Sequence, residues 1–254
     1  MRIEEHLSAL RAEGERLGDV AARMDVDASI PTCPEWRMRD LLRHIGDVHR
    51  WAAAHVGERR LEPIRDAAGV AEVAGPLPDD EDLLTWYRDG HAHLVKTLET
   101  ADPDVQCWSF LPAPSALAFW ARRQAHETTI HRADAESAAG PLTPVSTAFG
   151  LDGIDELLFG FLGRTPDPQA DVRTVRLTPT DADRRWLVRV GSDSVGAARS
   201  TDEAEGDTEV RGPASDLYLL LWNRLDREAV DVRGDPSALT TWRDTVTITW
   251  GRPR

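Results

Sequence analysis

Two segments of the chain carry histidine and glutamate side chains that could bind a metal ion. The first segment holds His44 and His49, and the second holds His126, Glu127 and His131. Imidazole nitrogens and carboxylate oxygens are the usual ligands of Zn²⁺ and similar divalent ions in proteins. These two segments are therefore the first places to look for a site that does chemistry.

The spacing of these residues limits which of them can share one ion. The second segment resembles the zincin pattern His-Glu-x-x-His, but its histidines are five positions apart instead of four. On a helix that turns about 100° per residue, His126 and His131 point about 140° apart, whereas Glu127 and His131 are only about 40° apart. Glu127 and His131 can therefore face the same ion. By the same arithmetic, at most one of His44 and His49 can join them.

Glu127 and His131 lie on a helical stripe that we expect to face the interior of a bundle. A buried glutamate is costly unless it is paired or bound to a metal. One carboxylate and one imidazole from this helix, with one imidazole from another, would make a three-ligand site that leaves a position open. From spacing alone, such a pair is more often a surface hydrogen bond, and periodicity slightly favours His49 over His44 as the inward residue. The stripe comprises Trp120, Gln124, Glu127, His131 and Ala135.

Hydrophobic periodicity predicts the elements that must position these side chains. A proline-rich linker at 164–168 separates a helical part from a part with short alternating strands. We therefore expect an α-helical bundle over 1–163 and a smaller α/β domain over 171–254. The predicted helices are 3–24, about 35–52, about 79–98, 115–138, 146–163, 213–225 and 236–244, and the predicted strands are 172–177, 186–190 and 229–233.

Composition argues against several classes of function. The chain has 254 residues, of which 41% are hydrophobic, and a formal net charge of −14. Without a concentrated run of Lys and Arg, nucleic acid and anionic membranes are poor partners. The acidic N-terminus is unlike a signal peptide and no stretch approaches about 20 apolar residues, so we expect a cytoplasmic protein. Cys33 and Cys107 are predicted to be semi-buried thiols, and His91 and His93 surface residues.

Two segments resemble the mycothiol-dependent maleylpyruvate isomerase family. Residues 31–45, PTCPEWRMRDLLRHI, are similar to its Pro-x-Trp-x-x-x-x-Leu-x-x-His-Leu signature, and residues 123–134, RQAHETTIHRAD, to its Arg-x-x-x-Glu-x-x-x-His helix. The resemblance extends over the whole chain. It implies a DinB-like four-helix bundle followed by a sterol-carrier-like α/β domain. It also implies a metal triad of His44, Glu127 and His131, in place of the periodic preference for His49.

The resemblance further implies a zinc-dependent enzyme that uses mycothiol. The ion would stabilise the thiolate, which would add to a cis double bond of an electrophilic substrate and leave after rotation. The stretch 214–224 is similar to the one that carries the family's catalytic arginine, so Arg224 is predicted to hold a substrate carboxylate. A helix salt bridge is the other role open to Arg224, because Leu-Trp-Asn-Arg stands where the isomerase has small residues and glycine.

Three points stay open at this level. The reaction could be a mycothiol S-transferase or detoxification step instead of an isomerisation. The protein could also be a non-catalytic module that holds a metal or a ligand without turnover. Two imidazoles and one carboxylate suit Zn²⁺, Ni²⁺ or Fe²⁺ equally well, so the metal is not specified.

Overall fold

The chain folds into two compact units, one from Met1 to Thr143 and one that begins at Pro144. The structure, a computed structural model, describes residues 1–162, 172–191, 195–200 and 206–246. The predicted architecture, a helical bundle followed by an α/β domain, is confirmed. The division differs from the expected ranges of 1–163 and 171–254, because the helices after Pro144 belong to the second unit.

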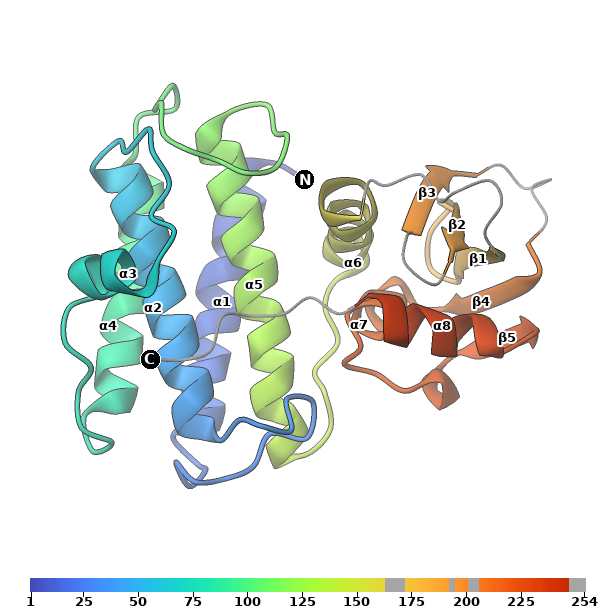
Figure 1. Ribbon diagram of the computed structural model, residues 1–254, viewed down its shortest axis with the longest axis horizontal. Helices are drawn as coiled ribbons and strands as arrows, with labels where there is room; N and C mark the ends of the chain where they lie inside the picture. The colour runs from blue at the N-terminus through green and yellow to red at the C-terminus, as the bar shows by residue number, and fades with distance from the viewer. Residues whose placement is uncertain (163–171, 192–194, 201–205, 247–254) are drawn as a thin grey trace. The chain divides into compact units, whose positions relative to one another are not determined.

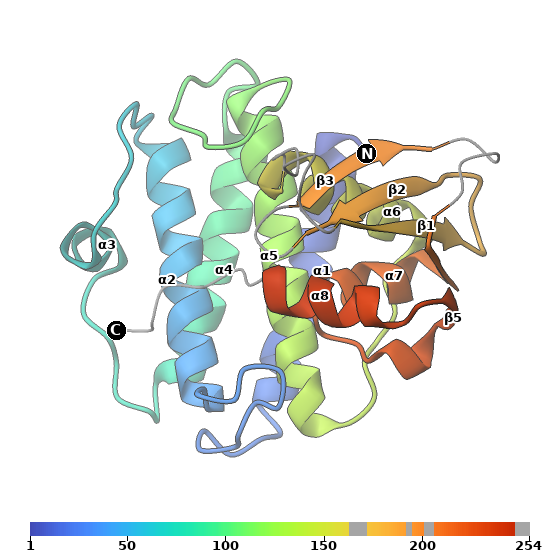
Figure 2. The same cartoon turned by 45° about the vertical axis from the view of Figure 1, so that its right-hand side comes forward.

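The first unit is built on four long helices that run side by side (Figures 1 and 2). Helix α1 packs against α4 and α5, and α2 packs against α4 and α5. A short fifth helix, α3, lies on α2 and was not predicted from the sequence. The bounds are α1 Ile3–Ala21, α2 Met38–Gly57, α3 Ala67–Ala74, α4 Leu83–Thr100 and α5 Ala116–Ala139.

Local interactions set where the long helices begin. Ser115 caps α5 by accepting a hydrogen bond from the backbone N–H of Ala118. Helix α2 begins at Met38, three residues later than predicted. The segment before it forms a tight turn, in which the N–H of Trp36 donates to the carbonyl of Cys33 at 2.8 Å. This turn places the indole of Trp36 next to the first turns of α2.

The second unit is a five-stranded sheet with helices packed against it. The strand order is β3-β2-β1-β4-β5, and only the β1–β4 pair is parallel. Helices α7 and α8 pack on the sheet, and α6 packs on α7. Two strands, β3 and β4, were not predicted. The bounds are α6 Thr147–Asp155, η1 Glu156–Phe161, β1 Arg173–Pro179, β2 Trp186–Val190, β3 Val195–Arg199, β4 Thr208–Gly212, α7 Ala214–Leu221, η2 Arg227–Ala229, β5 Asp231–Gly234 and α8 Ser237–Thr245.

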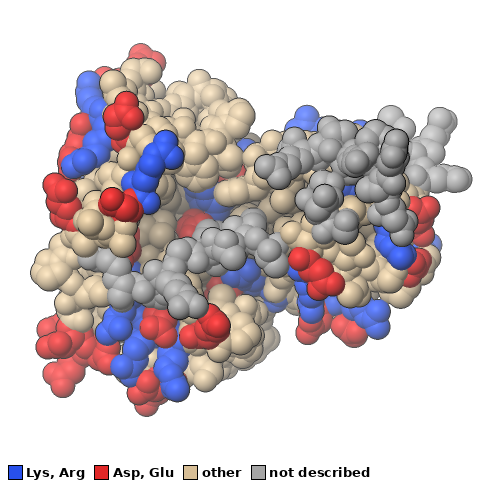
Figure 3. Space-filling view, viewed as in Figure 1, with Lys and Arg blue, Asp and Glu red and all other residues tan. Residues whose placement is uncertain are grey.

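The surface of the first unit mixes charges of both signs. On the face seen in Figure 3, acidic and basic side chains are interspersed over the bundle and do not gather into one large basic patch. Among the described residues, no helix is long and apolar enough to cross a membrane.

Candidate metal centre

His44, Glu127 and His131 meet inside the helical bundle. His44 comes from α2, and the other two come from α5. The Nε2 atom of His44 lies 3.6 Å from Oε1 of Glu127, and the Nε2 atom of His131 lies 3.4 Å from the same oxygen. One ligand atom from each residue lies within 4.8 Å of the other two. Two helices far apart in the sequence thus bring two imidazoles and one carboxylate to one point.

Two of the three donor–donor distances have the value that a zinc-sized ion requires. Ligand bonds of about 2.1 Å in a tetrahedron put neighbouring ligand atoms about 3.4 Å apart. The two distances to Oε1 of Glu127, 3.4 and 3.6 Å, agree with this and exceed the usual hydrogen-bond range of about 2.7–3.2 Å. The residues present therefore fit a divalent ion, with three protein ligands and a further position for water or a ligand.

Hydrogen bonds with neighbouring residues orient the two donors from α5. The Nδ1 atom of His131 lies 2.8 Å from Oδ2 of Asp134. An ionised carboxylate can only accept, so Nδ1 carries the proton and Nε2 is left to face Glu127. The hydroxyl of Thr32 donates to the other oxygen of Asp134 at 2.6 Å. Arg123 donates to Oε2 of Glu127 at 3.2 Å, which leaves Oε1 for the two imidazoles.

The charges at this site favour a cation between the three groups. Burial opposes ionisation of Glu127, but the adjacent imidazoles of His131 and His44 and the charge of Arg123 hold the pKa of its carboxyl far below the usual range. Burial also disfavours a charged His131, yet its hydrogen bond to Asp134 and the nearby carboxylate of Glu127 raise its pKa. Burial lowers the pKa of His44. In the metal-free protein, a proton on His131 supplies the positive charge that a bound metal ion would supply.

The indole of Trp36 lies against both imidazoles. Its ring centroid is 4.9 Å from that of His44 and 6.0 Å from that of His131, nearly parallel to the latter at 19°. The side chain is half-buried. It forms an apolar wall beside the donor atoms and restricts the access of water to them.

The other histidines of the two segments point elsewhere. The Nε2 atom of His49 is within 2.9 Å of the hydroxyl of Thr128, and its ring lies 5.4 Å from that of His91. The ring of His126 lies 6.0 Å from that of His6. The prediction that His91 is a surface residue was wrong, because it lies on the buried face of α4 and its Nε2 bonds the carbonyl of Leu10 at 3.0 Å.

Arg224 lies in the second unit, directly after α7. Its Nη1 donates to the carbonyl of Trp222 at 2.8 Å, and the side chain is half-buried. The catalytic role given to Arg224 by resemblance stays a prediction.

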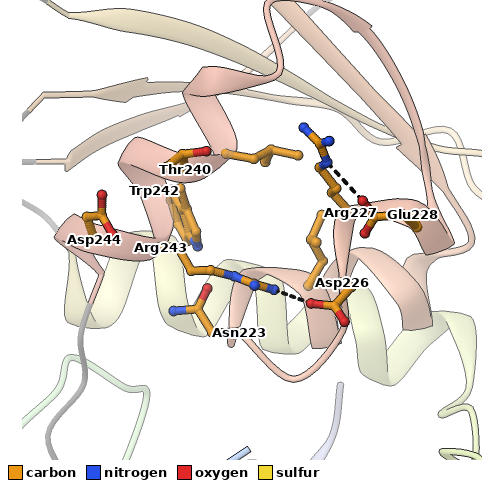
Figure 4. Close-up of a pocket in the computed structure, with 10 residues that line it drawn as sticks. Asn223, Asp226, Arg227, Glu228, Thr240, Trp242, Arg243 and Asp244 are labelled. Atoms are coloured by element: carbon orange, nitrogen blue, oxygen red, sulfur yellow. Dashed lines mark hydrogen bonds and ion pairs between the residues drawn. The ribbon is translucent and has the colours of Figure 1, made fainter.

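A pocket of about 410 Å³ also lies in the second unit, and the residues that line it do not include Arg224 (Figure 4). Two ion pairs lie at this pocket, Arg243 with Asp226 and Arg227 with Glu228. We assign it no role.

Asp134 and Thr32 were missed by the sequence analysis. Asp134 follows His131 by three positions, which is one helical turn, and this spacing is the signal that could have found it. Thr32 sits in the turn before α2 and is 102 positions from Asp134. Nothing in local periodicity predicts a contact over that distance.

Comparison with known proteins gives consistent results for both units. Residues 7–136 match the family model described as the mycothiol maleylpyruvate isomerase N-terminal domain, and residues 148–241 match the model of the C-terminal domain of the same family. No curated protein matches the sequence.

Two solved structures have the same fold. One is a crystal structure of the mycothiol-dependent maleylpyruvate isomerase, with a TM-score of 0.62 at 14% identity. The other is a histidine-to-alanine mutant of that isomerase, with a TM-score of 0.63 at 13% identity. In each case the match covers 91% of this chain and 93% of the other.

Proposed function

This chain belongs to the mycothiol maleylpyruvate isomerase family, and from that premise we propose that it is a divalent-metal-dependent enzyme that activates a low-molecular-weight thiol. The proposed ligands are His44, Glu127 and His131, with Zn²⁺ as the metal and mycothiol as the thiol. The observation that carries the proposal is the convergence of both Nε2 atoms on Oε1 of Glu127 at 3.4 and 3.6 Å.

The side chains around the site have separate tasks in this proposal. A bound Zn²⁺ supplies a strong local positive charge that lowers the pKa of a thiol at the open position. Glu127 and the two neutral imidazoles would hold that ion, and His131 would release its Nε2 proton on binding it. Asp134 keeps the proton on Nδ1 of His131, and Arg123 keeps Oε1 of Glu127 turned toward the imidazoles. Trp36 limits water at the same point.

The reaction we propose is isomerisation by addition and elimination. The thiolate adds to one carbon of a cis double bond, the resulting single bond rotates, and the thiolate leaves to give the trans product. The thiol is regenerated, so the reaction needs no oxidant or reductant. Arg224 would hold a carboxylate of the substrate, as the family resemblance implies. Support for this reaction comes from family membership, and support for the metal centre comes from the geometry.

An assay with two substrates tests the proposal. The zinc-loaded protein is incubated with mycothiol and either maleylpyruvate or a generic electrophile such as monobromobimane. We expect isomerisation of maleylpyruvate without net loss of thiol, and at least about 100-fold lower turnover in His44→Ala. The matched control is His93→Ala, which removes an exposed histidine of α4.

The other outcomes of this assay separate the alternatives. Thiol consumed in proportion to electrophile, without isomerisation, would identify an S-transferase. Full turnover in a folded His44→Ala protein would contradict the proposed site. Metal binding without any turnover would leave a binding module.

A further inference from the structure

Gln124 has a polar group that the fold does not satisfy. Its side chain is 1% exposed, and no described residue gives its Oε1 a hydrogen bond. A buried acceptor without a partner costs about 1–3 kcal/mol. Buried polar groups in native proteins nearly always have a partner, so this oxygen requires an explanation.

The position of Gln124 points it toward the metal centre. On α5, its direction lies about 20° from that of His131 and about 60° from that of Glu127, and it is about 4.5 Å along the helix axis from Glu127. One turn earlier, the ring of Trp120 lies 5.0 Å from that of Trp51 on α2. Gln124 therefore faces α2, between the metal ligands at one level and a pair of tryptophans at the next.

Three polar neighbours of Gln124 on α5 each make a side-chain hydrogen bond, although Nε of Arg123 is itself buried without one among the described residues. Arg123 donates to Glu127, the hydroxyl of Thr128 bonds His49, and the hydroxyl of Thr129 donates to the carbonyl of Ala125 at 2.7 Å. Gln124 differs from them because its acceptor serves neither the helix nor the centre. An acceptor that is kept buried at such a cost, about one helical turn from a metal ligand, is suited to bind a ligand of the metal centre.

We propose that Gln124 determines ligand specificity: its Oε1 accepts a hydrogen bond from an amide N–H or hydroxyl of the thiol held at the metal centre. The inference rests on the proposed function and adds the class of thiol, which must carry a hydrogen-bond donor near its sulfur. Simple alkanethiols, which lack such a donor, gain nothing from Gln124. The protein thereby selects a donor-bearing thiol such as mycothiol over small hydrophobic thiols.

Calorimetric titration of the zinc-loaded full chain tests this selection. The probes are mycothiol and 1-propanethiol, and the variant is Gln124→Met, which keeps the unbranched shape without the amide. We expect about tenfold weaker binding of mycothiol, which corresponds to the loss of one hydrogen bond, and unchanged binding of 1-propanethiol. Thr129→Val is the matched control on the opposite face of α5 and should leave both affinities unchanged. Zinc affinity should be the same in all three proteins.

Thermal unfolding of the metal-free protein gives a readout that needs no ligand. Removing an unsatisfied acceptor should stabilise the fold, so we expect Gln124→Met to raise Tm by about 2–4 °C. A structural role for the amide would lower Tm in this variant and in Gln124→Leu, and that result would overturn the inference.

The titration outcomes distinguish the proposed function from the proposed role of Gln124. Wild-type protein that binds zinc but no mycothiol would overturn the proposed function and this inference with it. Wild-type binding of mycothiol that Gln124→Met retains, or an equal loss for both thiols, would overturn this inference alone.

Discussion

Two groups of buried histidines occupy the same bundle and differ in what faces them. His44 and His131 face the carboxylate of Glu127. His49 and His91 lie with their rings 5.4 Å apart and bond a hydroxyl and a backbone carbonyl, with no carboxylate in contact among the described residues.

The difference shows that burial alone does not make a metal site. Burial lowers the pKa of both His49 and His91, so both imidazoles stay neutral in the core. At the other group, Glu127 and Asp134 outweigh burial and raise the pKa of His131. The proposed metal centre therefore has carboxylates that favour a cation, whereas burial of His49 and His91 disfavours one. The predictions below test this contrast.

Loss of the Glu127 carboxylate should have the largest effect. In Glu127→Gln, the ion loses its anionic ligand and the buried guanidinium of Arg123 loses its counter-charge. Breaking one side of a buried ion pair costs about 3–5 kcal/mol. We expect loss of stoichiometric zinc binding and a fall of that size in the free energy of unfolding of the metal-free protein, measured by urea denaturation. Zinc binding at wild-type affinity would show that Glu127 is not a ligand.

Asp134→Asn should have the next largest effect. The amide no longer requires a proton on Nδ1 of His131, so the ligand nitrogen is less well oriented and less basic. Loss of such a second-layer carboxylate usually lowers metal affinity about 10–100-fold. Competition with a chelator of known zinc affinity measures this. Asp19→Asn, which alters an exposed ion pair with Arg88, is the control and should leave the affinity unchanged.

The pH dependence of stability should show that His49 is neutral in the folded protein. The folded-state pKa of His49 lies well below its ordinary value of 6.5. Above pH 6.5 the residue is neutral in both states, and its stability contribution is fully present. As pH falls below 6.5, the unfolded chain binds a proton that the folded chain does not, so stability falls by up to about 1.4 kcal/mol per pH unit.

The substitution His49→Leu measures how much of this pH dependence comes from His49. The free energy of unfolding, measured from pH 7.5 to 5 with and without the substitution, should depend on pH less steeply in the variant. The absolute stability is not the readout, because the hydroxyl of Thr128 loses its partner in the same change. An identical pH slope in the two proteins would contradict the buried neutral state of His49.

Trp36 should give the smallest effect, a spectroscopic one. Its indole lies against both proposed imidazole ligands, so a paramagnetic ion such as Co²⁺ at the centre should quench its fluorescence. In Trp36→Phe we expect most of that quenching to disappear while Co²⁺ affinity changes less than about threefold. Undiminished quenching would place the ion away from Trp36.

Much of the fold could be predicted because its signals are local. The four long helices follow from apolar spacing, and the capping residue Ser115 marks the start of α5 within one position. The missed strands lack such a signal. β3, VGAAR, carries small residues instead of alternating large apolar ones, and β4, TEVRG, has only one large apolar residue. Their place in the sheet depends on pairing with β2 and β1, which is not local.

The residues of the candidate site likewise differ in whether local sequence signals could identify them. Glu127 and His131 could be found because one helix presents both. The choice between His44 and His49 could not be made from spacing, since both are buried and the difference lies in what faces each of them across the bundle. His91 was misplaced although its spacing of four from Tyr87, which is buried on α4, carried the signal. The contact of Thr32 with Asp134 and the burial of the Gln124 amide are defined only in the folded chain.

Metal content of protein purified without a metal-affinity tag is the most direct test of the centre. Mass spectrometry would compare wild type with His131→Ala and with the control His93→Ala. We predict about one Zn²⁺ per chain in wild type and in His93→Ala, and none in His131→Ala. No bound metal in wild type after incubation with Zn²⁺, or equal metal in all three proteins, would contradict the assignment of His44, Glu127 and His131 as a metal centre.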